Sequence, residues 1–455
     1  MRAISINRKQ VSKASRIPLL ALLLITVILS PSCKKYLDIT PTGMVMPQTL
    51  KDYRAVLTEA YNTEMNDRSI ASFRSDELQL DESDPENVEF VANPFIWNEN
   101  GTEFRSVIHN WRGQYKIIFY TNVVLKDGAN ATEGSKTEID QLLGEAYLLR
   151  AYTNFNLVNI YGPAYNAATA ATDKAVPLVT AVDLEQVAQR NTVQEIYTQV
   201  LSDIAAGKKL LNKESYESKY SYRFTSVAAD ALEARVYLYM KNYQASLDAA
   251  KRVLAKRSAL VDLNQAGALI PNDYTSVENI LALEKLFPGS LSNTTRVSET
   301  LKALYGITDL RLTAYYNTAT PMSVKKISND KYRTSFRTSE LYLIAAEASA
   351  ALKNPADAKN YLNTLKKARF TPAGYATEES KVNQLSDQGL VTEIADERAR
   401  ELAFEGHRWF DLRRTTQPRI AHQMKGKEYV LNAGDARYTI SIPRDAILNN
   451  GLLLK

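Results

Sequence analysis

Proton-transfer chemistry is possible in one short segment near the C-terminus, residues 397–414. Acidic and imidazole side chains stand close together there, including Glu401, Glu405, His407 and Asp411. Carboxylates beside a histidine can act as general acids and bases. The segment also carries Trp409 and Phe410, which would anchor a helix whose charged residues pair with one another. The residues alone leave the catalytic and the structural interpretation open.

A second acidic cluster, at residues 76–86, could bind a calcium ion or supply a pair of glycosidase carboxylates. Its members are Asp76, Glu77, Asp81, Glu82, Asp84 and Glu86. Their order does not match an EF-hand loop, and a solvated acidic loop is the alternative. The histidines His109, His407 and His422 are far apart and make no recognised metal-binding spacing. The sequence has no glycine-rich phosphate loop and no nucleophile elbow, so we expect no metal and no cofactor.

Residues 70–115 hold a mixture of side chains that suits sugar binding. The C–H face of a sugar ring packs on an aromatic side chain, while polar side chains bind its hydroxyl groups. The segment supplies Arg74, Asp76, Trp97, Asn98, Asn100 and Trp111. Trp97 stands in a stretch without helical periodicity, so we expect it to stack on a sugar, with Asp76, Asn100 and Arg74 as polar partners. Trp111 begins an expected helix with Tyr115 four residues later, which favours a core position.

A second segment without sustained periodicity, residues 258–335, is rich in Asn, Ser, Thr, Gly and Asp. We expect it and residues 70–105 to form long ligand-binding loops with short strands, because loops of this length in a compact protein are usually functional or disordered. The second segment adds further candidates for ligand contact, Tyr305, Tyr315 and Tyr316.

The elements that must position these loops are mostly helical. A capping box of Thr49 and Asp52 predicts the start of the first helix. The strongest signal is a repeated helix pair, near residues 225–257 and 337–368. Its apolar stripe recurs after 114 residues, as Val227, Ala231, Ala234 and Leu238, then Leu341, Ala345, Ala348 and Leu352. Alanine-rich pairs of this kind resemble tetratricopeptide repeats, in which each pair covers its neighbour's apolar face.

A third pair, near residues 139–211, is split by a loop rich in Ala and Thr. Its second helix is expected to begin at Thr192, with Glu195 completing a capping box.

A final helix is expected at residues 391–412. Two ion pairs are expected along its face, Asp396 with Arg400 and Glu405 with Arg408.

The first 32 residues have the composition of a bacterial export signal peptide. They contain five basic residues, no acidic residue and an apolar run from Ile17 to Leu29, which is too short to span a bilayer. Small residues precede Cys33, the only cysteine of the chain. We therefore expect Cys33 to be lipidated and to begin the mature chain, with residues 33–48 as an extended tether. An ordinary signal peptide that ends near a buried cysteine is the alternative.

Removal of this signal peptide would change the charge of the protein. The whole chain has a formal net charge of +5, and its first 32 residues carry five positive charges and no negative one. The remaining chain is therefore neutral. A neutral chain without a basic patch gives no support to a nucleic-acid function.

Segments distributed over nearly the whole mature chain share one resemblance. The most specific is ERARELAFEGHRWFDLRR at residues 397–414, and the others, in order, are 32–41, 144–151, 157–162, 228–239, 337–348 and 442–444. Together they resemble the SusD/RagB family, the outer-membrane nutrient-uptake lipoproteins of Bacteroidetes. The resemblance implies a single SusD-like domain at residues 49–455. It would be mainly α, with about four tetratricopeptide-like helix pairs, long irregular loops and minor β structure.

The resemblance also carries functional expectations. It implies capture of an oligosaccharide and its delivery to a SusC-like TonB-dependent transporter, with a tryptophan of the N-terminal loop in the binding site, which favours Trp97. It implies a structural role for residues 397–414, because the family binds glycans and does not cleave them. We thus expect no enzymatic activity and a lipid-anchored protein that faces outward from the outer membrane. A helix-repeat scaffold that binds only proteins is the first alternative, and a glycoside hydrolase the second.

Overall fold

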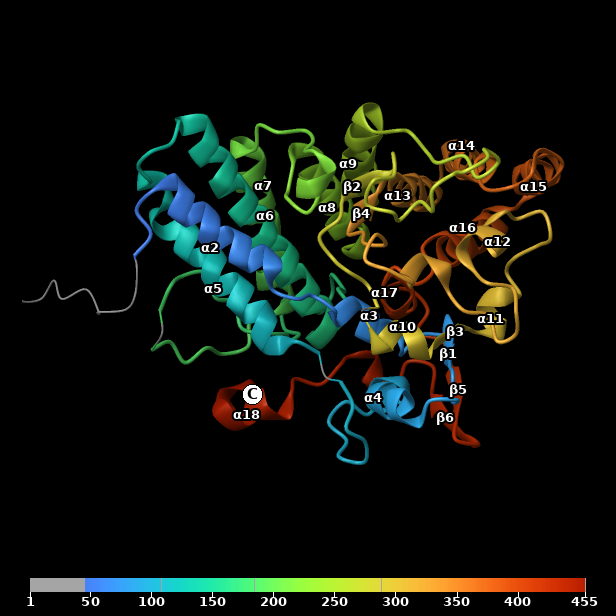
Figure 1. Ribbon diagram of the computed structural model, residues 1–455, viewed down its shortest axis with the longest axis horizontal. Helices are drawn as coiled ribbons and strands as arrows, with labels where there is room; N and C mark the ends of the chain where they lie inside the picture. Colours follow the sequence, from blue (N-terminus) through green and yellow to red (C-terminus); the bar gives the residue numbers. More distant parts are fainter. Residues whose placement is uncertain (1–45, 108, 184, 288, 455) are drawn as a thin grey trace, which may run out of the picture. The chain divides into compact units, whose positions relative to one another are not determined.

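A computed structural model describes residues 46–107, 109–183, 185–287 and 289–454. The elements named below belong to one compact unit, Gln48–Lys455 (Figure 1). The expected signal peptide, Cys33 and the tether up to residue 45 lie outside the described residues. Within the described residues, no helix combines the length and the apolar character needed to cross a bilayer.

Helices make up most of the regular structure, which confirms the predicted fold class (Figure 1). The longer ones are α2 (Leu50–Asn62), α4 (Pro85–Phe95), α5 (Trp111–Asp127), α6 (Lys136–Tyr161), α7 (Val193–Leu210), α8 (Ser226–Tyr239), α9 (Tyr243–Lys256), α13 (Thr338–Ala351), α14 (Pro355–Lys367), α15 (Pro372–Gln384) and α16 (Asp387–Glu401). The shorter ones are α3 (Asp67–Ser72), α10 (Ser290–Thr294), α11 (Glu299–Lys302), α12 (Arg311–Tyr315), α17 (Arg408–Arg414) and α18 (Arg444–Asn449), with the 3-10 turns η4 (Ser218–Tyr220) and η5 (Lys325–Ile327).

Neighbouring helices pack as pairs, as the sequence predicts. Helix α6 packs on α7, α8 on α9, and α13 on α14, while α2 and α5 form a further pair that lies against α6. Because α7 also contacts α8, and α9 contacts α13, successive pairs form one continuous array (Figure 1). Both predicted capping boxes are present, Thr49 with Asp52 at the start of α2 and Thr192 with Glu195 at the start of α7.

The pairs α8–α9 and α13–α14 share the same turn. In each, a lysine adopts the left-handed backbone region after the first helix, Lys241 at φ 59° and Lys353 at φ 62°. The next residue, Asn242 or Asn354, caps the second helix with its side chain. Equivalent helix bounds differ by 112 residues, so the predicted offset of 114 is wrong. Because helix α8 is buried on most sides, its apolar periodicity does not determine which of its residues correspond to which residues of α13.

Among the described residues, three small antiparallel sheets supply the minor β structure. The paired strands are β1 (Leu78–Leu80) with β3 (Thr295–Val297), β2 (Asn279–Leu281) with β4 (Phe336–Arg337), and β5 (Ile420–Met424) with β6 (Lys427–Leu431). Strands β5 and β6 form a hairpin whose two turn residues, Lys425 and Gly426, both have positive φ, as tight hairpin turns require. The other two sheets tie the 258–335 segment to distant parts of the chain.

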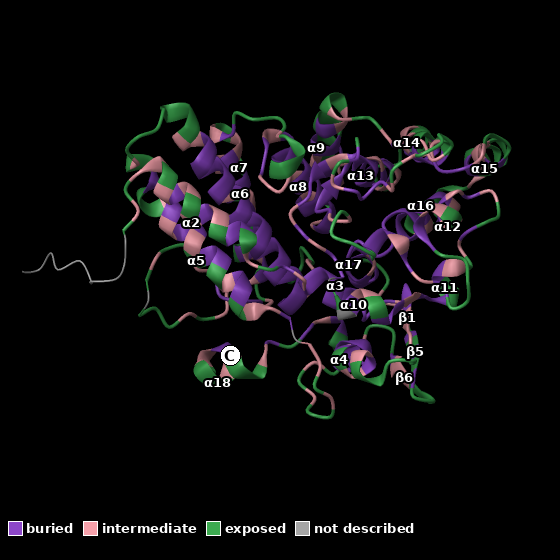
Figure 2. Ribbon diagram, viewed as in Figure 1, coloured by how far each residue is buried: buried purple, intermediate pink, exposed green. Residues whose placement is uncertain are grey.

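In the part of the chain that the structure describes, the buried hydrophobic side chains form three clusters. The main one spans α2, α5 to α9 and α13, and Figure 2 shows α6, α8 and α13 buried along most of their length. A second cluster surrounds α4 and the short helices of residues 290–315, and a third joins α13 to α16. The helix array thus supplies a rigid support for the irregular segments.

The predicted final helix at residues 391–412 is in fact two helices, α16 and α17. Between them Phe404 and Gly406 adopt left-handed conformations, with φ of 59° and 70°. A Cβ atom on Gly406 would lie 2.7 Å from Cβ of Arg68, so only glycine permits this approach. The backbone N–H of Phe404 also donates to the buried Glu77 side chain at 3.0 Å. Contacts with the distant residues Arg68 and Glu77 therefore divide residues 391–412 into two helices, although the local sequence predicts one.

The predicted loop at residues 70–105 is wrong where α4 forms. The Asp84 side chain caps this helix by accepting hydrogen bonds from the backbone N–H groups of Glu86 and Asn87, and Pro85 occupies its first turn. Pro94 lies inside this helix. Because proline is uncommon inside helices, the segment was not predicted to be helical. The second predicted loop segment, residues 258–335, contains short helices and strands between irregular stretches.

Candidate ligand-binding site

Trp97 lies in the protein interior, contrary to the expectation of an exposed loop. Its side chain is 2 % exposed, and its indole N–H donates to the backbone oxygen of Arg74 at 2.9 Å. The ring stacks on His422, with ring centroids 4.4 Å apart. His422 also stacks on Phe95, with ring centroids 4.1 Å apart. Trp97 therefore packs between α4 and the β5–β6 hairpin, although its stretch has no helical periodicity.

The three polar partners expected around Trp97 lie in different environments. The Arg74 side chain is buried, pairs with Glu99 and lies 4.5 Å from the ring centroid of Trp409. Asp76 accepts two hydrogen bonds from Arg408, at 2.6 and 2.7 Å, and remains partly exposed. Asn100 is exposed. The structure therefore does not gather these residues around an accessible aromatic face, and ligand binding by Asp76 and Asn100 stays a prediction.

The three tyrosines of the second segment also pack in the core. Tyr305 is 9 % exposed, and Tyr315 and Tyr316 are fully buried. The hydroxyl groups of Tyr305 and Tyr316 are 2.8 Å apart, and that of Tyr305 donates to the backbone oxygen of Arg400 at 2.7 Å. Burial raises the pKa of all three phenols. The premise of exposed loop tyrosines is wrong for this trio.

Residues 397–414 form the centre of a buried ionic network. Glu401 accepts hydrogen bonds from Arg311, Arg337 and Arg369, at 2.6 to 3.0 Å. Burial alone would raise the pKa of Glu401, but Arg369 and Arg337 bring it well below the ordinary value. Glu405 is likewise buried and accepts from Arg337 and Lys326. These carboxylates are therefore held ionised by fixed cations, which supports the structural interpretation.

The ion pairs expected along the final helix are wrong. Arg400 pairs with Glu393 and Glu397. Arg408 reaches Asp76, far away in the sequence. Because the backbone turns between α16 and α17, side chains that a continuous helix would bring together point to other partners.

His407, in the same segment, is also buried. Burial, reinforced by the nearby Arg68, lowers the pKa of His407 well below its ordinary value. One of its ring nitrogens lies 3.1 Å from the Arg68 guanidinium. A neutral imidazole that faces a fixed cation serves the packing of α3 against the start of α17.

The acidic cluster at residues 76–86 is also dispersed by the fold. Asp81 pairs with Arg296, Asp84 caps α4, and Glu82 accepts from the backbone N–H of Lys425. Among the described residues, no group of three or more His, Cys, Asp and Glu side chains is placed to hold a metal ion.

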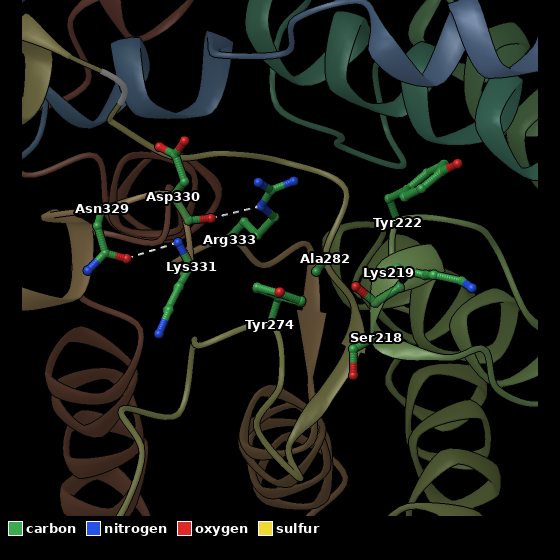
Figure 3. A pocket seen from close by; sticks show the side chains of 10 residues that line it. Ser218, Lys219, Tyr222, Tyr274, Ala282, Asn329, Asp330, Lys331 and Arg333 are labelled. Atoms are coloured by element: carbon green, nitrogen blue, oxygen red, sulfur yellow. Dashed lines mark hydrogen bonds between the residues drawn. The ribbon is translucent and has the colours of Figure 1, made fainter.

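A surface cavity of about 570 Å³ presents a different set of residues, and we call it the tyrosine cavity. Its volume lies within the range of small-molecule sites, about 300–1,000 Å³. It is lined by Ser218, Lys219, Ser221, Tyr222, Tyr274, Ala282, Asn329, Asp330, Lys331 and Arg333. Figure 3 shows residues 218–222 on one side of the cavity, residues 329–333 on the other, and Tyr274 and Ala282 between them.

Backbone hydrogen bonds fix both sides of the tyrosine cavity. The N–H of Ala282, directly after β2, donates to the oxygen of Ser221, and the N–H of Tyr274 donates to the oxygen of Lys331, each at 2.9 Å. Tyr222 packs edge-to-face on Tyr61 of α2, with ring centroids 5.3 Å apart. The helix array and strand β2 therefore hold in place segments that are irregular in themselves.

The lining of the tyrosine cavity suits a polyhydroxylated ligand. Tyr222 and Tyr274 are half-buried and supply aromatic surface. Asn329 is exposed and supplies an amide group, whose side-chain oxygen accepts a hydrogen bond from the backbone N–H of Lys331. Aromatic rings beside amide, hydroxyl and cationic groups are what binding of a sugar ring requires.

Tyr222 and Tyr274 could not be singled out from the sequence. Tyr274 lies in the 258–335 segment, which was expected to bind ligand, but tyrosine is common in this chain and type alone did not separate it from the buried ones. Tyr222 lies in the short connection between α7 and α8. A signal was present, since serine and lysine alternate with tyrosine at residues 218–222 without periodicity.

Comparison with known proteins identifies relatives over nearly the whole chain. A family described as "Starch-binding associating with outer membrane" matches residues 35–238, and the SusD family matches residues 194–445. The SusD-like protein P38 of Formosa agariphila is 23% identical, over 89% of this chain and 92% of that protein. The SusD-like protein P25 of the same bacterium is also 23% identical, over 84% and 86%.

Solved structures share the fold. A SusD superfamily protein of Bacteroides thetaiotaomicron has a TM-score of 0.73 at 21% identity, covering 89% of this chain and 99% of its own. One of Bacteroides fragilis has a TM-score of 0.75 at 21% identity, covering 90% and 100%. A laminarin-binding SusD-like protein has a TM-score of 0.61 at 19% identity, covering 81% and 92%. Because the SusD model alone spans more than half of the sequence, this chain belongs to the SusD family.

Proposed function

We propose that this SusD-family protein binds an oligosaccharide in the tyrosine cavity and makes no covalent change to it. The observation that carries the proposal is the lining of that cavity, which has Tyr222 on one side, Asn329 on the other and Tyr274 between them. The solved relative described as a laminarin-binding SusD-like protein supports a glycan as the ligand class. A cavity of about 570 Å³ accommodates a short stretch of a glycan chain, not a whole polymer.

The test begins with a ligand screen. Soluble polysaccharides are offered to the detergent-solubilised protein in affinity gels, and the best ligand is then titrated by calorimetry. Tyr274→Ala removes one ring of the cavity and should weaken binding roughly fivefold, because an aromatic contact contributes about 0.5–1.5 kcal/mol beyond area burial. Tyr375→Ala is the matched control, since Tyr375 is a half-buried tyrosine of α15 outside the cavity. Equal binding by Tyr274→Ala and Tyr375→Ala would place the site elsewhere.

We also propose that Cys33 is lipidated and anchors the protein at the outer membrane, facing outward. The support is the basic, apolar and small-residue order before Cys33, together with the family described as associating with the outer membrane. Cys33→Ser should move the protein from the membrane fraction to the soluble fraction. An unmodified Cys33 in the mass spectrum of the mature protein would contradict this anchoring.

The proposed destination of the glycan is a SusC-like TonB-dependent transporter. The support is membership of the SusD family, and the rigid helix array offers a preformed surface for such a partner. Affinity purification of the native protein from outer membranes should recover a large β-barrel protein in comparable amount. Recovery of other periplasmic or surface proteins alone would favour the helix-repeat scaffold.

A further inference from the structure

Arg333 is held at the wall of the tyrosine cavity by contacts that leave part of its guanidinium group unused. Its Nε–H donates to the backbone oxygen of Asp330 at 3.0 Å, and its guanidinium carbon lies 5.8 Å from the ring centroid of Tyr274. Among the described residues, no carboxylate lies within 4 Å of it, and its two terminal nitrogens donate to no protein oxygen. A fixed guanidinium with two free terminal nitrogens matches the two oxygens of a carboxylate or sulfate group.

The charges around the cavity also leave an excess of positive charge. Asp330 is already paired with Lys285 at 2.5 Å, and Lys219 is paired with Glu217 at 3.0 Å. Lys331, next to Arg333 on the same loop, has no carboxylate within 4 Å among the described residues. The two remaining cations thus belong to the same loop on one side of the cavity, and their side chains extend from it in different directions (Figure 3). An excess of charge in a concave site attracts ligands of the opposite sign.

We propose that the glycan of the tyrosine cavity is anionic and carries carboxylate or sulfate groups, which Arg333 and Lys331 bind. This inference rests on the proposed glycan-binding function and adds the substrate class. Neutral side chains of the cavity pack on the sugar rings, while Arg333 binds the charged substituent through its two terminal nitrogens. Lys331 adds a second, exposed cation from the same loop. Arg333 and Lys331 therefore favour anionic glycans over neutral ones, whereas the tyrosines contact the sugar rings of both.

The experiment compares one sugar backbone at three charge states. Dextran, carboxymethyl dextran and dextran sulfate, together with polygalacturonate, are titrated into the detergent-solubilised protein at low and at high salt. The anionic polymers should bind at least tenfold more tightly than dextran at low salt, and this advantage should shrink as salt screens the charges. Comparison of the carboxylated and sulfated dextrans shows which of the two anionic groups the cavity prefers.

Paired variants locate the effect. Arg333→Gln with Lys331→Gln should remove most of the preference for anionic polymers, measured as the ratio of the affinity for each anionic polymer to the affinity for dextran. Arg112→Gln with Lys251→Gln is the control, because it removes the same charges from exposed positions on α5 and α9 outside the cavity. Retention of anionic binding by the first double variant, or its equal loss in the control, would overturn the inference.

The inference and the proposed function fail in different ways. A neutral glycan that binds more tightly than every anionic polymer, with Tyr274→Ala weakening it, overturns the anionic ligand and leaves the glycan-binding function in place. Absence of binding across all the anionic polymers overturns the inference, and the neutral members of the ligand screen then decide the proposed function. If Tyr274→Ala and the double variant Arg333→Gln with Lys331→Gln each weaken the binding of anionic polymers, the result supports both the glycan-binding function and the anionic ligand.

Discussion

Trp97 and His422 stack nearly parallel, with ring centroids 4.4 Å apart and an angle of 21° between the planes. The ring nitrogens of His422 lie 2.6 Å from the backbone oxygen of Phe95 and 2.8 Å from that of Ser75, and a protonated ring nitrogen donates to the oxygen that it faces. The stack joins the end of α4 to strand β5. Trp97 thus stabilises the packing of residues 70–105 against strand β5.

Trp97→Ala should therefore destabilise the protein. Truncation of a buried aromatic side chain costs about 3–5 kcal/mol of the free energy of unfolding, which urea denaturation measures. Trp97→Phe keeps a ring against His422 but loses the hydrogen bond to Arg74, and it should cost less. A Trp97→Ala protein with unchanged stability and lost glycan binding would restore the tryptophan platform that the sequence suggested.

Trp409→Ala should be at least as costly, again about 3–5 kcal/mol. Trp409 is fully buried, stacks on Tyr438 at 5.0 Å and 8°, and carries the Arg74 guanidinium on its ring. Trp111, which is only half-buried on α5, is the comparison. Thermal melts of the two alanine variants should show the larger loss for Trp409, and the reverse order would argue against the structural role of residues 397–414.

Glu77 should make the stability of the fold depend on pH near neutrality. Burial raises the pKa of Glu77 to about 7, although the N–H of Phe404 partly opposes this. The folded state then holds a proton that the unfolded chain has released between about pH 4.5 and 7. The free energy of unfolding contributed by Glu77 is highest at low pH and falls by roughly 3 kcal/mol as pH rises through this window.

Glu77→Gln keeps the acceptor for Phe404 and removes the titration. The stability difference between the variant and the wild type, measured by urea denaturation from pH 4.5 to 8, should grow in favour of the variant as pH rises. A difference that stays constant over this range would show that Glu77 does not titrate there.

The buried Glu401 should have the opposite pH signature. Burial opposes its ionisation, but Arg369 and Arg337 lower the pKa of Glu401 well below its ordinary value. Its contribution to stability is therefore full above about pH 4.5 and is lost as pH falls below it. Glu401→Gln leaves buried arginines without their partner and should cost about 3–5 kcal/mol at neutral pH. Glu428→Gln, at a half-exposed carboxylate of β6, is the control and should cost under about 1 kcal/mol.

The helix pairs could be predicted from local sequence signals. Capping boxes at Thr49 and Thr192 mark helix starts through interactions within one turn, and the structure contains both. The residue offset between the alanine-rich pairs α8–α9 and α13–α14 could not be predicted from such local signals. Helix α8 is buried on nearly all sides, so its apolar stripe has no unique phase.

The break at Phe404 and the burial of Trp97 depend on contacts between distant segments. Phe404 meets Glu77, and Trp97 meets His422, each across more than half of the chain. No periodicity within either segment encodes such contacts. The tyrosine cavity has the same origin, because Tyr222 and Arg333 come together only once β2 and the helix array have formed.

The position of bound ligand tests the central claim most directly. A crystal structure of the protein with the tightest-binding oligosaccharide from the screen should show sugar density in the tyrosine cavity, in contact with Tyr222 or Tyr274. A charged substituent should lie within hydrogen-bond distance of the terminal nitrogens of Arg333. Sugar bound outside the cavity, for example against Asp76 and Asn100, with the tyrosine cavity left empty, would contradict the account.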